Sequence, residues 1–304
     1  MMSATIVTHS RLEPAVVGET PTVQALGRLA GLVDRLACPA TGRKLTLSAD
    51  GQSLLAESVS YPVRDGLPLM LQGEALARAR AWQPDARRST RRRIWSLVPS
   101  PVSGRRQRRY LTRFLSTCRP GELIVNVGSG GWDLGPEVVN LDVLPHHGVD
   151  LCGDIHRLPF GAGEVDALIC TGVLEHIADP VAAVAELRRV LRPGGAVFCT
   201  VPFLQAYHED PADYRRYTVT GLRQLFADFE SLRIRPSHGV GSALAWVAAD
   251  ALAALLACNV NRLHTAWLML LRCVFAPLRL LDRFSEGSRF EHLACCGLLV
   301  EATR

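Results

Sequence analysis

Two short segments of the sequence hold side chains that could move a proton. Glu175 and His176 follow an apolar run, and a later polar segment contains His208 and Asp210. A histidine titrates near neutral pH and can accept a proton from a hydroxyl or an amine, while a nearby carboxylate can orient it. We therefore take His208 as the first candidate general base, Asp210 as the group that orients it, and His176 as the second candidate. The alternative is that these side chains only cap a helix or fix a loop.

The same polar segment could hold a metal only through consecutive residues. His208, Glu209 and Asp210 are adjacent in the sequence, and adjacent side chains chelate a single ion poorly. We therefore expect no metal site.

A glycine-rich segment offers a place for a nucleoside ligand. Gly128 and Gly130 follow a β-branched run, and glycine lets a ligand approach the backbone closely. Asp142 ends the next apolar run, where a carboxylate can accept two hydrogen bonds from ribose hydroxyls. The stretch between Gly128 and Asp142 is shorter than the roughly 20 residues of the dinucleotide fingerprint. It leaves no room for the helix that would hold a pyrophosphate, so a nucleoside without phosphates fits better than NAD.

These residues need a scaffold that brings them together, and the second half of the chain predicts one. Near-continuous apolar runs alternate with helical segments, which is typical of a Rossmann-like, doubly wound, mainly parallel α/β sheet of seven strands. Ligands of such sheets bind beyond the carboxyl ends of the strands. The predicted strands are 123–127, 138–143, 149–152, 166–171, 196–202, 231–237 and 296–302, and the predicted helices begin at Asp179 and at residue 221.

The first 116 residues divide into three parts of different composition. Residues 1–35 form an extension with a short helix, and 36–72 form a small β-rich module with a hairpin turn at Asp50-Gly51. Residues 73–116 are a connector, in which twelve arginines and one acid lie between Arg78 and Arg113. Such a block can attract phosphate, or it can simply be a solvated linker. The fourth part, 117–304, is the domain with the sheet, and it contains an apolar helical insertion at 242–284.

Three motifs follow one another at a recognisable spacing. They are Asp154-Ile-His-Arg-Leu-Pro-Phe160, Leu174-Glu-His-Ile177 and Leu191-Arg-Pro-Gly-Gly-Ala-Val197. In this combination the chain from about Leu123 to Pro202 resembles class I S-adenosylmethionine-dependent methyltransferases. The resemblance implies S-adenosyl-L-methionine as the cofactor. The family's usual acid in the glycine motif is Asn126 here, and its third glycine is Trp132.

The resemblance also implies roles for individual residues. Gly128 and Gly130 would contact the methionine and ribose parts of the cofactor, Asp142 the ribose, and Asp154 with Ile155 the adenine. The full set of expected cofactor residues is Asn126, Gly128, Ser129, Gly130, Asp142, Val143, Asp154, Ile155 and Gly172. Related methyltransferases carry a similar segment at the substrate entrance, which here implies substrate contacts from Tyr207, Asp213, Tyr214 and Arg215.

The module at 36–72 is similar to small zinc-ribbon-like proteins that activate some methyltransferases. Cys38-Pro39 opens it, but Thr41 stands where that family often has a second cysteine, and no later cysteine pair follows. The module is therefore expected to lack a zinc site and to be structural.

Together these features predict a methyltransferase that acts on an oxygen or nitrogen of an apolar or amphipathic small molecule, such as a secondary metabolite or a glycolipid-type acceptor. A nucleic-acid methyltransferase is an alternative because of the basic block, although the loop after the fourth strand lacks an Asn/Asp-Pro-Pro-Tyr motif. A third reading is a cofactor-binding protein that does not methylate. Nine scattered cysteines without a C-x-x-C pair fit a reducing cytosol. No unbroken apolar run of about 18 residues predicts a membrane span, but the insertion at 242–284 could lie on a membrane surface or between two copies of the chain.

Overall fold

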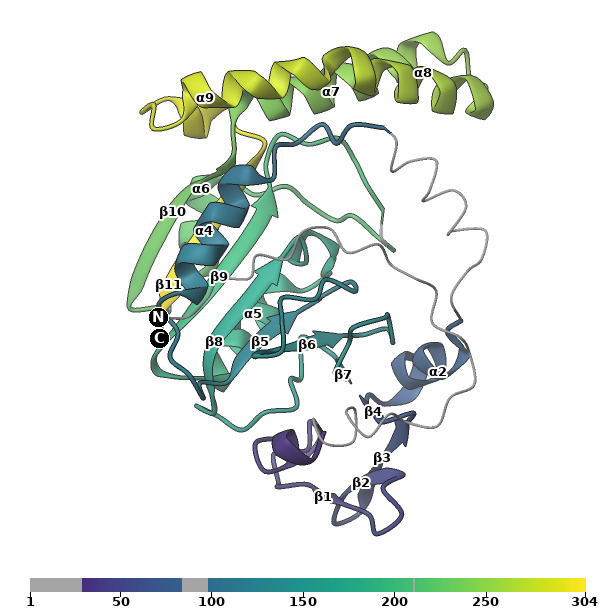
Figure 1. Cartoon of the computed structure of the whole chain (residues 1–304), viewed down its shortest axis with the longest axis vertical. Helices are drawn as coiled ribbons and strands as arrows, with labels where there is room; N and C mark the ends of the chain where they lie inside the picture. The colour runs from purple at the N-terminus through teal and green to yellow at the C-terminus, as the bar shows by residue number, and fades with distance from the viewer. Residues whose placement is uncertain (1–28, 84–97, 210) are drawn as a thin grey trace.

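The computed structural model describes residues 29–83, 98–209 and 211–304. Within these ranges, eleven strands form one sheet in the order β1-β2-β3-β4-β7-β6-β5-β8-β9-β11-β10 (Figure 1). The seven strands from the second half of the chain are parallel, except that β11 runs antiparallel to β9 and β10. They are β5 (Ile124–Val127), β6 (Val138–Asp142), β7 (Leu151–Gly153), β8 (Val165–Thr171), β9 (Leu191–Pro202), β10 (Ser231–His238) and β11 (Gly297–Thr303). This arrangement confirms the predicted Rossmann-like sheet.

Helices cover both faces of the sheet, which explains why its central strands are mostly apolar. On one face, α5 (Pro180–Val190) packs Val184 and Leu187 into the main core, and α6 (Val219–Leu225) joins it there. On the other face, α4 (Arg105–Leu115) buries Leu111 and Phe114 against the central strands. Residues of the arginine-rich stretch therefore form a helix of the domain itself.

The prediction of seven strands was wrong, because the N-terminal module lengthens the sheet. Its strands are β1 (Thr46–Leu47), β2 (Ser53–Ala56), β3 (Val59–Arg64) and β4 (Leu67–Met70), followed by α2 (Gly73–Ala81). The hairpin at Asp50-Gly51 is confirmed, with β1 and β2 antiparallel. Strand β4 pairs in parallel with β7, Leu69 opposite Cys152 and Met70 opposite Gly153. An edge strand has unpaired backbone groups that can accept a further strand, and β4 satisfies those of β7.

The strand predicted to start at residue 196 starts earlier, at Leu191. Helix α5 ends at Val190, so Gly194 and Gly195 lie within β9 and do not end the helix. Leu191 pairs with Val165, and the pairing then shifts before Ala196 meets Ala167. The two glycines therefore form an irregularity in the strand, where Gly194 takes a φ of +73°.

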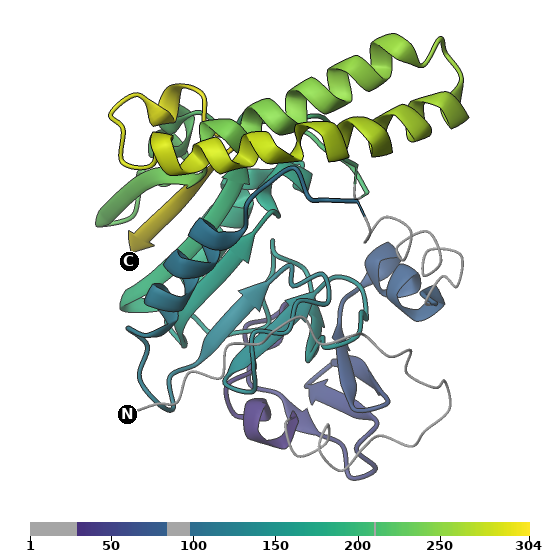
Figure 2. The ribbon, with the colours of Figure 1, turned by 45° about the horizontal axis from the view of Figure 1, so that its top comes forward.

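The insertion forms a long helical hairpin above the carboxyl ends of the strands (Figures 1 and 2). It consists of α7 (Val240–Leu256), α8 (Asn261–Phe275), η2 (Ala276–Leu281) and α9 (Asp282–Ser285), and η3 (Glu291–Leu293) leads into β11. A seam that includes Ala249, Ala253, Leu268 and Leu271 holds α7 against α8. Arg106 of α4 anchors the base, because its Nη1 lies 2.6 Å from Oε1 of Glu291 and both side chains are buried.

Candidate active site

A cavity of about 430 Å³ opens at the carboxyl ends of β5, β8, β9 and β10, below the helical hairpin. The glycine loop after β5 forms one wall, and the residues after β8 and β9 form another. Its lining includes Gly128, Ser129, Gly130, Trp132, Thr171, Gly172, Glu175, His176, Thr200, Gln205, His208, His238 and Trp246. The structure thus brings most of the predicted glycine residues and both predicted histidines to one cavity.

The glycine loop has a backbone shape that requires glycine at Gly128. Its φ is +69°, and a Cβ at this position would lie 2.4 Å from Cγ2 of Val173. The N–H of Gly130 donates to Oδ2 of Asp142 at 2.8 Å, and Leu144 N–H donates to Oδ1 at 3.0 Å. Asp142 therefore positions the loop, and each of its carboxylate oxygens has capacity for a further hydrogen bond from a ribose hydroxyl.

Two polar side chains of the loop region differ in their environment. Asn126 is buried, and its Nδ2 donates to Oδ1 of Asn140 at 3.0 Å, so it links β5 to β6 and does not line the cavity. Ser129 lines the cavity, and within the described ranges its buried Oγ has no hydrogen-bond partner. Ser129 is thus a donor and acceptor that a ligand could satisfy.

The residues expected at the adenine lie at the ends of β6 and β7, outside the cavity lining. Oδ1 of Asp154 accepts from the N–H of His156 at 2.9 Å and lies 2.8 Å from its Nδ1. Ile155 is buried, and Val143 is exposed. Asp154, Ile155 and Val143 therefore lie outside the cavity that the glycine loop lines.

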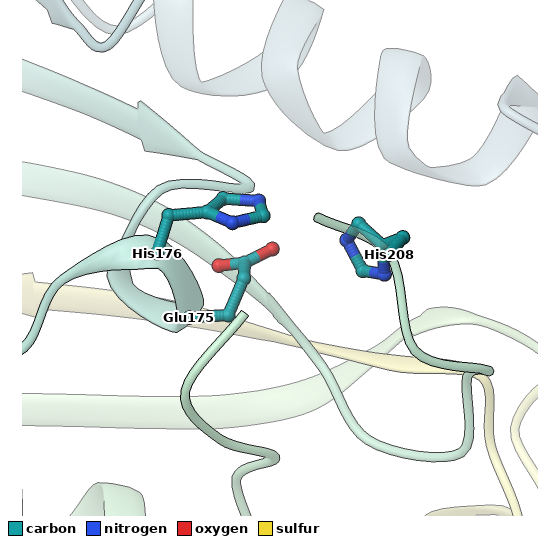
Figure 3. A group of neighbouring side chains, drawn as sticks. All are labelled: Glu175, His176 and His208. Carbon is teal, nitrogen blue, oxygen red and sulfur yellow. The ribbon is translucent and has the colours of Figure 1, made fainter. Parts of the chain in front are cut away.

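At the other end of the cavity, three side chains from two elements converge. Glu175 and His176 lie in η1 (Leu174–His176), directly after β8, and His208 lies in the loop after β9 (Figure 3). One ligand atom from each of the three lies within 4.8 Å of those of the other two. The two imidazole rings meet edge to face at 5.3 Å, and Trp246 of α7 lies 5.8 Å from the ring of His208. We call Glu175, His176 and His208 the His–Glu cluster.

Glu175 is the buried member of this cluster, with only 2% of its surface exposed. Burial raises the pKa of its carboxyl group to about 7, and the neighbouring His176 and Arg216 oppose the shift. Its Oε2 has no hydrogen-bond partner among the residues that the structure describes. A carboxylate here is costly unless a cation or a donor approaches it.

The loop after β9 is fixed by Asp213, which was predicted to contact the substrate. Its carboxylate binds both terminal nitrogens of Arg216 and accepts from the N–H of His208 at 2.8 Å. The hydrogen bonds from Arg216 hold the pKa of Asp213 at about 2. Oδ2 also lies 3.6 Å from Nδ1 of His208, so Asp213 occupies the orienting position that was predicted for Asp210. Asp210 itself lies outside the described residues.

The other expected substrate residues do not line the cavity. Tyr207 and Tyr214 are exposed, and the hydroxyl of Tyr207 donates to Glu209. Arg215 donates to the carbonyl of Ala178 at 2.6 Å. Four further residues that line the cavity, Thr200, Gln205, His238 and Trp246, belong to none of the sequence motifs. Trp246 alone had a signal, as an aromatic residue in a helix of alanines and leucines.

Part of the chain matches a known protein family. Residues 131–199 match the family described as Methyltransferase domain. The chain is 39% identical over 108 residues to an uncharacterized transposon protein of Streptomyces fradiae, a match that covers 28% of this chain and 31% of that protein. It is 50% identical over 46 residues to a UPF0434 protein of Marinomonas sp., covering 14% of this chain and 71% of that protein. The chain thus spans less than a third of the first relative's length.

The fold is also similar to solved structures. A phosphoethanolamine N-methyltransferase of Haemonchus contortus, in complex with phosphomonomethylethanolamine and S-adenosylhomocysteine, aligns with a TM-score of 0.46 and 11% identity. The alignment covers 78% of this chain and 62% of that one.

The Rossmann-like sheet, the glycine loop with Asp142, and the family match together define a class I S-adenosylmethionine-dependent methyltransferase domain. Over its 46-residue match, the chain also belongs to the UPF0434 family.

Proposed function

We propose that the protein transfers the methyl group of S-adenosylmethionine to an oxygen or nitrogen of an apolar or amphipathic small molecule, of secondary-metabolite or glycolipid type. The cavity carries this proposal. Its glycine residues suit the cofactor, and the His–Glu cluster and Trp246 line the same cavity, where they would meet an acceptor. Trp246 belongs to the apolar hairpin, so an acceptor with an apolar part would meet a matching surface.

For methyl transfer, the protein must mainly position the two reactants and remove a proton from the acceptor. The lone pair of the acceptor attacks the methyl carbon while the carbon–sulfur bond breaks, and S-adenosylhomocysteine leaves. The acceptor proton passes to a base, for which we propose His208 first and His176 second. Holding the two reactants in line supplies much of the rate enhancement.

We propose further that the helical hairpin lies on an anionic membrane surface, which places the protein at the cytoplasmic side of a membrane. The hairpin exposes large apolar side chains, among them Leu255 at 76% and Phe284 at 83%. Within the described ranges, the helical segment Asn261–Ser285 is long and apolar enough to cross a membrane by length and composition, with a mean hydropathy of 1.2, and only 6% of its apolar window is buried. Arg272 and Arg279 interrupt this segment, which is why a search for an unbroken apolar run misses it.

The arginines favour a position on the membrane over one across it. Four of them, apart from Arg272, which pairs with Asp250, occur from α8 to the start of η3. Anionic headgroups attract such side chains at the surface. They are Arg262, Arg279, Arg283 and Arg289.

Calorimetry with S-adenosylhomocysteine tests the cofactor assignment. We expect micromolar binding, weakened at least tenfold by Asp142→Ala because the variant loses both the ribose contact and the support of Gly130; tenfold is about 1.4 kcal/mol. Asp133→Ala, whose carboxylate binds only the N–H of Gly135 in this region, is the matched control. Absence of binding by folded wild-type protein would contradict the proposal.

Mass analysis of acceptors then separates methyl transfer from mere cofactor binding, and a methylated RNA product would favour the nucleic-acid alternative.

Vesicle sedimentation tests the membrane surface. We expect the protein to sediment with vesicles that contain anionic phospholipid and less with purely zwitterionic ones. Leu255→Asp combined with Phe284→Asp should abolish sedimentation, because a charge on the apolar face opposes burial at the headgroup boundary. The control is Leu55→Asp combined with Val181→Asp, at two exposed apolar residues of β2 and α5, outside the hairpin. Equal sedimentation of both double variants would contradict the proposal.

A further inference from the structure

The His–Glu cluster has the composition of a metal site that a single stretch of sequence does not reveal. Its members are two imidazoles and one carboxylate from two separate loops, in contrast to the consecutive residues 208–210. All three face one another across the cavity end (Figure 3). Two histidines and one carboxylate form a common ligand set for catalytic zinc and for non-haem iron.

Each imidazole has a backbone carbonyl as a contact of its Nδ1. Nδ1 of His176 lies 2.5 Å from the carbonyl oxygen of Ala212, and Nδ1 of His208 lies 3.1 Å from that of Ala206. A carbonyl can only accept, so Nδ1 of His176 carries the hydrogen and its Nε2 keeps its lone pair. Nδ1 of His208 also lies 3.4 Å from Nη2 of Arg216, so among the described residues these contacts engage Nδ1 and leave Nε2 for a ligand. Metal-ligating histidines are oriented in this way by a partner on the second ring nitrogen.

The charges around the cluster are balanced except at Glu175. Arg216 approaches His208, but its two terminal nitrogens bind the carboxylate of Asp213, so this pair is neutral. Glu175 is almost fully buried, and its Oε2 is without a hydrogen-bond partner among the described residues. A buried carboxylate without a partner is costly, and a bound cation would remove that cost.

We propose that Nε2 of His176, Nε2 of His208 and the carboxylate of Glu175 bind one divalent transition-metal cation of the Zn²⁺ class. Three protein ligands leave a coordination position open toward the cavity, as in catalytic zinc sites. This inference rests on the proposed methyl transfer and narrows its acceptor to an oxygen, a hydroxyl group that the cation would bind.

The cation would also change where the acceptor proton goes. With both Nε2 atoms engaged as ligands, neither histidine can act as the base. The cation lowers the pKa of the bound hydroxyl, the proton passes to water, and the resulting alkoxide attacks the methyl carbon. No electron is gained or lost in this sequence.

Metal binding is tested directly with Zn²⁺ and Co²⁺ on chelator-treated full-length protein without a histidine tag. We expect one Zn²⁺ per chain by calorimetry and a visible Co²⁺ spectrum typical of a low coordination number, which Zn²⁺ abolishes by displacement. Mg²⁺, which prefers oxygen ligands, should not compete. Glu175→Gln, His176→Ala and His208→Ala should each weaken binding at least tenfold, while His264→Ala on the hairpin should not change it.

Circular dichroism identifies variants that fail to fold, and Glu175→Gln retains the shape of the side chain for this purpose. Stoichiometry below one, or binding that none of the three cluster variants weakens, would overturn the proposal. Binding of S-adenosylhomocysteine is measured on the same metal-free protein. If S-adenosylhomocysteine binds and Zn²⁺ does not, the proposed metal site is wrong and the proposed methyl transfer stands. If Zn²⁺ binds and S-adenosylhomocysteine does not, the proposed methyl transfer is wrong and the metal site stands.

Discussion

Gly128 is the residue at which one added methyl group would most disturb the cofactor wall. In Gly128→Ala, the new Cβ would lie 2.4 Å from Val173 in a backbone conformation that L-residues rarely adopt. We expect a loss of about 2–4 kcal/mol in the free energy of unfolding, from the conformation and the overlap together. Gly130→Ala has a similar φ of +57° but meets no atom within 4 Å, so it should lose only about 1–2 kcal/mol. Urea unfolding measures both, and equal losses would show that the contact with Val173 is relieved without cost.

The sequence indicates which residues could take part in catalysis, but it does not indicate which of them lie in contact. His176 and His208 are separated by a whole helix and strand, and their rings come to 5.3 Å only because β8 and β9 are parallel neighbours. Asp213 illustrates the limit. It looks like one of several equivalent acids in a polar loop, and only the folded loop shows that Arg216 occupies its carboxylate and that its oxygen lies beside His208.

Among the elements, α4 and η3 depend on a single buried ion pair. Arg106→Met leaves the buried carboxylate of Glu291 without its cation and with the hydroxyl of Ser285 as its remaining hydrogen-bond donor, which should cost about 3–5 kcal/mol of unfolding free energy. Arg109, one turn along the same helix, pairs with Glu286 at the exposed surface. Arg109→Met should therefore cost less than about 1 kcal/mol. Urea unfolding of the two variants checks the difference, and similar costs would mean that the buried pair does not anchor the hairpin.

The elements of the sheet were predictable to within a few residues because buried parallel strands are apolar on both faces and leave a clear signal. The pairing of β4 with β7 was not predictable in the same way. It joins segments about eighty residues apart, Leu69 and Cys152 among them, and nothing in either short run specifies the other. The early start of β9 was missed because glycines after a helix ordinarily mark its end, whereas here they form a bulge.

For the whole molecule, His238 predicts how stability changes with pH. Burial lowers the pKa of this histidine from 6.5 to about 4. Between these values the unfolded chain binds a proton that the folded chain does not, so the free energy of unfolding falls as the pH falls through this window. The loss should approach about 3 kcal/mol at pH 4. Urea unfolding of wild type and His238→Gln from pH 4 to pH 7 measures it, and a constant difference between the two would contradict the assignment.

The parallel pair of β4 and β7 has a consequence for the chain as an assembly. Because the strand that pairs with β7 is covalently attached, its local concentration is set by the connecting chain and not by expression or dilution. The ratio of module to catalytic domain is fixed at one by the gene. A separate protein that offered a strand to the same edge of β7 would have to displace β4.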